Sequence, residues 1–144
     1  MRAEAPTPEA MSAFLNELVN AWNSHDLDRV TTFYAPDYEG IDVGQPQVQH
    51  GPAAVREALA SYLRAFPDLH FTGENAVIQG GQAALTWTAH ATHLGPLLNI
   101  PATGRKVEVR GVSVLTVEDD QVKHGLYIWD LAGLLRKIGL LPEL

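Results

Sequence analysis

The sequence predicts an α+β fold in which helices pack on the concave face of one strongly curved antiparallel sheet. Apolar residues recur at helical spacing up to Phe66, the period changes to two from Leu69 onward, and helical spacing returns after Asp130. Because helices and strands are segregated along the chain and each has one apolar face, the two sets must bury these faces against each other. The expected result is a cone-shaped barrel.

Length and composition fit a single domain over residues 1–144, with residues 1–6 as a loose tail. The chain is 46% hydrophobic and 19% charged, which is typical of a globular protein with a real core. Its net charge of -7 argues against a nucleic-acid surface and against binding to an anionic membrane. The chain has no cysteine, so disulfides and zinc–thiolate sites are excluded. No signal peptide or membrane span is recognisable, and we expect a cytoplasmic protein.

Start and stop signals predict four helices. Thr7 is a favourable N-cap, and Pro8 and Glu9 suit a first helical turn. Pro67 and Gly139 are typical of positions just beyond a helix end. The predicted helices cover residues 8–22, 27–34, 51–66 and 130–138.

The predicted strands are residues 38–43, a hairpin of 69–79 with 82–93, and a hairpin of 106–118 with 121–130. In the second hairpin, a two-residue turn at Asp119-Asp120 pairs Val117 with Val122, and an uninterrupted ladder then pairs Val109 with Asp130. Paired residues share a face, so one face is an apolar wall with three polar interruptions. This wall consists of Val109, Gly111, Ser113, Leu115, Val117, Val122, His124, Leu126, Ile128 and Asp130.

The opposite face of the same hairpin carries Val112, Val114, Tyr127 and Trp129. Because it points away from the helices, these apolar side chains would be left in water in a monomer. We therefore expect a homodimer through the outer sheet face.

Inward aromatic side chains and an apolar irregular segment, residues 94–104, predict a pocket for a hydrophobic small molecule. Trp87 shares its strand face with small alanines, which leaves space beside it. The predicted substrate contacts are Trp22, Tyr38, Trp87, Leu97, Leu98, Ser113 and Ile128.

Asp130 has two interpretations that predict opposite pKa shifts. An aspartate directly before a helix is a common N-cap, and capping lowers its pKa. A general acid/base on an apolar pocket wall instead needs a pKa raised toward neutrality.

The histidines carry less information. His93 either polarises a substrate carbonyl or is a structural residue bonded to the backbone of the following loop. His124 is about 20 Å along the strand from Asp130, so the two cannot form a dyad. His90 and His93 lie on opposite faces of a strand, which argues against a metal site. The sequence has no phosphate-binding loop and no nucleophile elbow.

Several segments together resemble the SnoaL-like polyketide cyclases, a family of the nuclear-transport-factor-2-like superfamily. These segments are AWNSHD (21–26), YAPDY (34–38), FPDL (66–69), THLG (92–95), IPATGR (100–105), RGVS (110–113) and WD (129–130). The chain departs from the family at Ile41-Asp42, where many relatives carry His before the acid, and at Ala91-Thr92-His93, where Gly-Thr-His is common.

The resemblance implies a cone-shaped α+β barrel and a cofactor-independent intramolecular aldol ring closure. It places Asp130 as the acid/base, and we expect His93 to stabilise the enolate oxygen. The superfamily also contains isomerases, dehydratases, hydrolases and non-catalytic binding proteins, so these alternatives stay open. Epoxide hydrolysis is disfavoured because Arg110 is expected on the face opposite Asp130.

Overall fold

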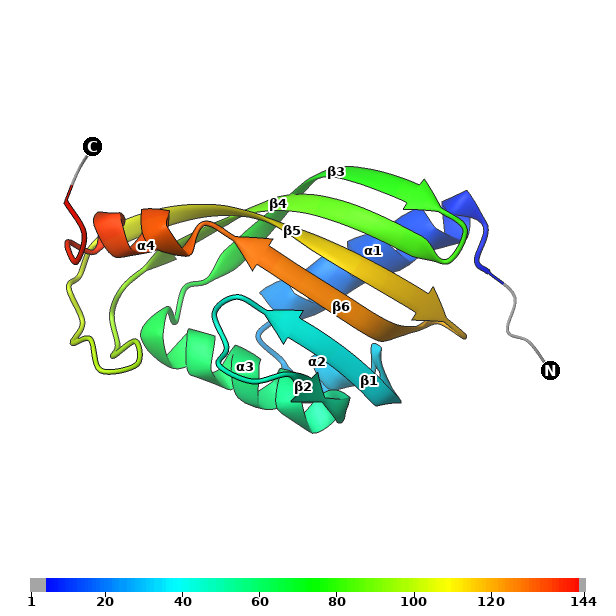
Figure 1. The fold of residues 1–144 in the computed structure, drawn as a ribbon, viewed down its shortest axis with the longest axis horizontal. Helices are drawn as coiled ribbons and strands as arrows, with labels where there is room; N and C mark the ends of the chain where they lie inside the picture. The colour runs from blue at the N-terminus through cyan, green and yellow to red at the C-terminus, as the bar shows by residue number, and fades with distance from the viewer. Residues whose placement is uncertain (1–4, 143–144) are drawn as a thin grey trace.

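Apart from the short strand β2, helices and strands follow one another as the sequence predicts in a computed structural model that describes residues 5–142 (Figure 1). Most of the predicted loose tail lies outside these residues. The elements are α1 (Pro8–Asn23), α2 (Leu27–Thr31), β1 (Tyr34–Asp42), β2 (Gln49–His50), α3 (Gly51–Ala65), β3 (His70–Gln79), β4 (Gln82–Thr92), β5 (Lys106–Glu118), β6 (Gln121–Trp129) and α4 (Leu131–Lys137).

The six strands form one curved, unclosed sheet in the order β2-β1-β6-β5-β4-β3. The expected α+β architecture is confirmed, and α1 and α3 pack against β3 and β1, respectively (Figure 1). The sheet is antiparallel as expected except at one place, where β1 pairs with β6 in parallel. No hairpin joins these two strands, so the connection does not impose an antiparallel direction.

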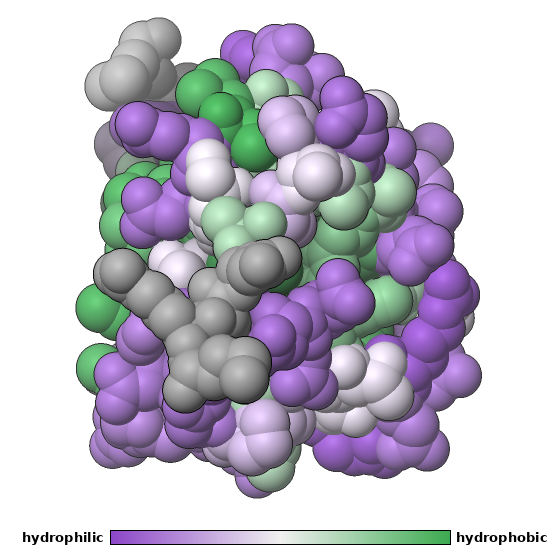
Figure 2. Space-filling model, turned by 90° about the vertical axis from the view of Figure 1, so that its right-hand side faces the viewer, coloured by the Kyte–Doolittle hydropathy of each residue, from purple (hydrophilic) through white to green (hydrophobic). Residues whose placement is uncertain are grey.

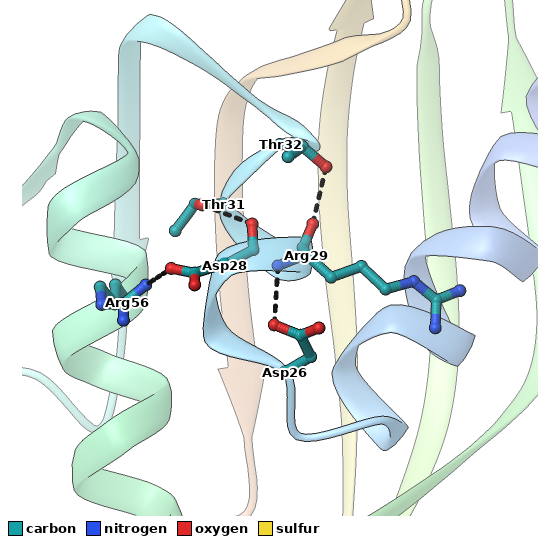
Figure 3. A network of polar contacts seen from close by, with 6 residues as sticks. All are labelled: Asp26, Asp28, Arg29, Thr31, Thr32 and Arg56. Atoms are coloured by element: carbon teal, nitrogen blue, oxygen red, sulfur yellow. Dashed lines mark hydrogen bonds and ion pairs between the residues drawn. The ribbon is translucent and has the colours of Figure 1, made fainter.

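The predicted helix starts are confirmed by their caps. Thr7 Oγ1 accepts a hydrogen bond from the backbone N–H of Ala10 at 3.1 Å, and Asp26 accepts one from the N–H of Arg29 at 3.1 Å. An ion pair between Asp28 and Arg56 joins α2 to α3 (Figure 3). Because this ion pair is exposed, it contributes little to the stability of the fold. The position of α2 depends instead on the buried side chain of Val30.

The first strand is longer than expected. Phe33 and Tyr34 were assigned to the second helix, but that helix ends at Thr31 and β1 begins at Tyr34. The backbone N–H of Val122 donates to the carbonyl of Phe33 at 2.8 Å, so pairing with β6 extends the strand toward its start. Tertiary pairing here outweighs the local helical pattern.

The β5–β6 hairpin has the predicted turn but a different register. Asp119 and Asp120 both have positive φ, 52° and 58°, as a type I′ turn requires, and Val117 pairs with Val122. A β-bulge then shifts the ladder by one residue, so that Thr116 pairs with His124. One extra residue reverses the faces of the rest of β6. Trp129 therefore turns inward, while Ile128 turns outward and is 48% exposed.

Two glycines lie side by side where β1 meets β6. Gly40 and Gly125 are register partners, and a Cβ on either would overlap a tyrosine ring lying across it, Tyr38 over Gly40 and Tyr127 over Gly125. The missing side chains let the two rings lie against the sheet, and their hydroxyl groups meet at 2.7 Å.

The outward face of the sheet carries a row of apolar residues across five strands. In register this row contains Val77, Ala84, Val114, Leu126 and Ile41. Val112 and Val114 were correctly placed on this face, but Leu126 and Ile128 replace Tyr127 and Trp129. By contrast, polar side chains make up most of the surface at the end of the molecule that Figure 2 shows. No helix within residues 5–142 has the length and apolar character needed to cross a bilayer.

Candidate functional site

A cavity lies between the concave face of the sheet and helices α1 and α3. Its volume is about 140 Å³. Aliphatic and aromatic side chains make up nearly all of its wall, and Asp42 is the one carboxyl among the lining residues that the structure describes. No Lys, Arg or His is among them. The cavity thus suits an apolar organic molecule.

Three hydrogen bonds hold the carboxylate of Asp42 at the end of β1. Oδ1 accepts from the backbone N–H of Gly44 at 2.8 Å and from the indole N–H of Trp129 at 2.9 Å. Oδ2 accepts from the hydroxyl of Tyr62 at 3.1 Å. A carboxylate offers about four lone-pair positions, so one remains for a ligand. None of the described Lys or Arg residues forms an ion pair with Asp42.

Tyrosine hydroxyls provide a second polar group. Tyr38 and Tyr127 share a hydrogen bond of 2.7 Å, and Tyr34 accepts one from the indole N–H of Trp22 at 3.0 Å. Burial raises the pKa of Tyr34, Tyr38 and Tyr127 well above the usual tyrosine value. These hydroxyls are therefore protonated at neutral pH. Two hydroxyls joined by one hydrogen bond use one of their two hydrogens, so the Tyr38–Tyr127 pair can donate the other to a ligand.

The raised tyrosine pKa values predict a loss of stability in alkali. Above the ordinary tyrosine pKa of about 10, the unfolded chain loses a proton that buried Tyr34 keeps, so the free energy of unfolding should fall by about 1.4 kcal/mol per pH unit for this group. In Tyr34→Phe, the free energy of unfolding lacks this pH-dependent contribution. The stability difference between wild type and Tyr34→Phe should therefore shrink between about pH 9 and about pH 11 in urea titrations. A difference that stays constant over this range would contradict the prediction.

Four of the predicted substrate contacts line the cavity: Trp22, Tyr38, Trp87 and Ser113. The indole N–H of Trp87 donates a hydrogen bond to Ser113 Oγ at 3.0 Å, so these two polar groups of the cavity wall are hydrogen-bonded to each other. Whether these residues bind a substrate stays a prediction.

The other three predicted contacts were placed wrongly. Leu97 is buried in a separate apolar cluster around Phe66 and Leu134, and Leu98 is 79% exposed. Ile128 lies on the outward sheet face because of the β-bulge. None of the three is among the residues that line the cavity.

Asp130 does not face the cavity, and the expectation that it does was wrong. It is exposed and caps α4, with Oδ1 accepting a hydrogen bond from the N–H of Gly133 at 2.8 Å. The β-bulge places it beside Arg110 and Ile128 in a shallow depression on the outer face. These contacts agree with the N-cap interpretation of Asp130. A catalytic role for Asp130 stays a prediction, without support from this geometry.

His93 is fully buried but does not line the cavity. Its Nδ1 accepts a hydrogen bond from the backbone N–H of Thr103 at 3.3 Å and lies 2.9 Å from Thr103 Oγ1, whereas its buried Nε2 has no hydrogen-bond partner among the described residues. Its ring packs 5.5 Å from that of Phe66, which itself lines the cavity. These contacts match the structural interpretation, in which His93 fixes the loop that follows it. His124 is exposed on the outer face and also lies away from the cavity.

The residues that the sequence failed to place are Asp42, Tyr127 and Trp129. In the sequence, Asp42 was notable only because the residue before it, Ile41, stands where many members of the resembled family carry His. The one available signal was the alternation along β1, because Tyr38, Gly40 and Asp42 must share a face. The described residues contain no group of three His, Asp or Glu side chains that could hold a metal ion.

This combination of a curved sheet, covering helices and an internal pocket with few polar groups defines a class of α+β proteins with a cavity between sheet and helices. The model of the SnoaL-like polyketide cyclases matches residues 13–138, so the chain belongs to this family. Among curated proteins, none matches it.

Solved structures with the same fold include AclR from Streptomyces galilaeus, a proposed hydroxylase. It is 26% identical, with a TM-score of 0.85 and coverage of 96% of this chain and 90% of AclR. TsrD from Streptomyces laurentii is 26% identical, with a TM-score of 0.84 and coverage of 94% and 99%. IdmH from Streptomyces antibioticus, a proposed polyketide cyclase, is 24% identical, with a TM-score of 0.76 and coverage of 89% and 97%. At this identity, IdmH shows the fold alone.

Proposed function

We propose that the protein is a cofactor-independent acid/base enzyme that closes a ring in a hydrophobic, polyketide-type substrate by intramolecular aldol addition. The observation that carries this proposal is the oriented carboxylate of Asp42 on the wall of an apolar cavity. The geometry supports Asp42 as the base in place of Asp130, and the tyrosine hydroxyls as the enolate donors in place of His93.

The proposed step begins with transfer of a proton from the carbon alpha to a carbonyl group to Asp42. The resulting enolate carbon attacks a second carbonyl group of the same molecule and forms the new carbon–carbon bond. Asp42 then returns its proton to the alkoxide, and the product is a cyclic β-hydroxy ketone. Atoms and electrons balance without an oxidant or a reductant.

Tyr38 is positioned to stabilise the enolate oxygen. Its ring lies over Gly40, two residues from Asp42 on the same strand face, so the hydroxyl is about 7 Å from the aspartate along the strand. In the proposed complex, a carbonyl group and its α-carbon lie between the two side chains. A hydroxyl donor aimed at the forming oxyanion typically contributes about 10²- to 10³-fold in rate.

Proton abstraction can be tested without knowing the natural substrate. Benzoylacetone carries exchangeable protons alpha to an aryl ketone, and NMR in D₂O follows their replacement by deuterium. The protein should accelerate this exchange beyond buffer alone and should bind the ketone. Binding without acceleration would favour the non-catalytic binding alternative, and absence of both would contradict the proposal. Isomerases and dehydratases share the first proton transfer, and product analysis separates them from a cyclase.

We also propose that two copies of the chain associate through the outward sheet face. The exposed apolar residues on this face are Ile41, Val43, Val77, Val114, Leu126 and Ile128. Contiguous exposed apolar residues often mark a protein–protein contact, and a two-fold axis would pair this face with itself.

Leu126→Glu should convert this dimer to a monomer in sedimentation velocity at micromolar concentration. The reason is that a charge at the centre of an apolar interface loses its hydration without a partner. Val48→Glu also places a charge on an exposed apolar residue, but off the sheet, and should stay dimeric. A monomeric wild type would contradict this assembly.

A further inference from the structure

Gln49 places a buried amide group inside the cavity. It belongs to the edge strand β2, is 8% exposed and lines the cavity. Its register partner is Gly40, which lies between Tyr38 and Asp42 on the same face of β1. The amide of Gln49 therefore lies alongside the space between the proposed base and the proposed enolate donor.

The amide of Gln49 differs from the other polar groups of the wall because it makes no hydrogen bond with any residue that the structure describes. Asp42 has three donors, Tyr38 pairs with Tyr127, and Ser113 pairs with Trp87. Glutamine carries two N–H donors and a carbonyl acceptor, and those of Gln49 are free to meet a ligand in the cavity. A ligand that supplies an oxygen atom here would satisfy it.

Charge and acidity indicate where that oxygen belongs in the ligand. A carboxylate is a weak base in general, so a base of this type deprotonates most readily a carbon flanked by two carbonyl groups. The negative charge of the resulting enolate is shared between two oxygens, and each gains from a hydrogen-bond donor. The tyrosine pair supplies a donor for one oxygen, and the amide of Gln49, which lines the same cavity beside Gly40, can supply N–H donors for the other.

We propose that Gln49 is a specificity-determining residue that binds the second oxygen of a 1,3-dicarbonyl substrate. This inference rests on the proposed function, because it assumes that Asp42 and the tyrosine pair bind the first carbonyl group. It adds a requirement that the apolar cavity alone would not impose, namely two carbonyl oxygens on alternate carbons.

The test compares benzoylacetone with butyrophenone, which has the same aryl ketone and chain length but lacks the second oxygen. Isothermal titration calorimetry measures both dissociation constants. Wild type should bind benzoylacetone about tenfold more tightly, as expected for one additional hydrogen bond to a buried amide. Gln49→Met keeps the side-chain length and should abolish this preference by weakening benzoylacetone alone. Gln79→Met, on the exposed end of β3, should keep it.

Three results would overturn the inference. Equal affinity of wild type for the two ketones excludes the second contact without any variant, so the test does not depend on the folding of Gln49→Met. If Gln49→Met lost affinity for both ketones equally and kept the wild-type circular dichroism spectrum, the loss would arise from altered packing and not from a hydrogen bond to the second oxygen. In both cases, accelerated proton exchange in wild type would leave the proposed function standing. If wild type binds neither ketone, the proposed function fails together with the inference.

Discussion

Asp42→Asn should lower the rate of benzoylacetone proton exchange by about 10²- to 10⁴-fold while the protein stays folded. Asparagine keeps an oxygen to accept from Gly44 and Trp129, and its NH₂ group can donate to Tyr62, which reverses one hydrogen bond without breaking it. The variant loses the proton acceptor and little else. NMR exchange rates together with a thermal unfolding curve measure both effects.

Asp130→Asn is the matched control, because it makes the same chemical change at an exposed N-cap. Asparagine caps helices about as well as aspartate, so stability should change little. The exchange rate should stay at the wild-type level. If Asp130→Asn lost activity and Asp42→Asn kept it, the role predicted from the sequence would return to Asp130 and the proposed site would be wrong.

Gly125→Ala should destabilise the fold and disable the enolate donor together. Its Cβ would overlap the Tyr127 ring, so that ring must move and the 2.7 Å bond to Tyr38 must break. Overpacking of this kind costs about 1–3 kcal/mol, and loss of an oxyanion donor costs about 10²- to 10³-fold in rate. Urea titration and the exchange assay should both show the change.

Gly73→Ala is the control for Gly125→Ala. A Cβ at Gly73 would meet Leu85 and Val19 at 3.6 and 3.9 Å, which are ordinary contacts. Its stability should equal or slightly exceed that of wild type, because alanine restricts the unfolded chain. Equal losses in both variants would show that the cost arises from glycine replacement in general and not from the tyrosine pair.

The sequence predicted most of the helices and hairpins because their signals are local. Thr7, Pro67 and the Asp119-Asp120 turn act within a few residues of themselves, and the structure places them as expected. The parallel β1–β6 pair and the edge strand β2 depend on contacts between distant segments. No local pattern encodes such contacts, so both were missed.

The site was only partly predictable, for a different reason. Both faces of β6 carry large apolar residues, Leu126 and Ile128 on one and Tyr127 and Trp129 on the other. Hydrophobic alternation therefore fits either register equally well. The β-bulge next to the turn decides between them, and it moved Asp130 outward while it brought Trp129 against Asp42.

The same bulge limits how residue roles can be transferred between members of this family. A relative with one residue fewer at the position of Lys123 would present its counterpart of Asp130 to the interior and its counterpart of Trp129 to solvent. An alignment without a gap there would match an interior side chain of one protein with a surface side chain of the other. Assignments along the last strand therefore require the insertion and deletion pattern at Lys123 as well as residue identity.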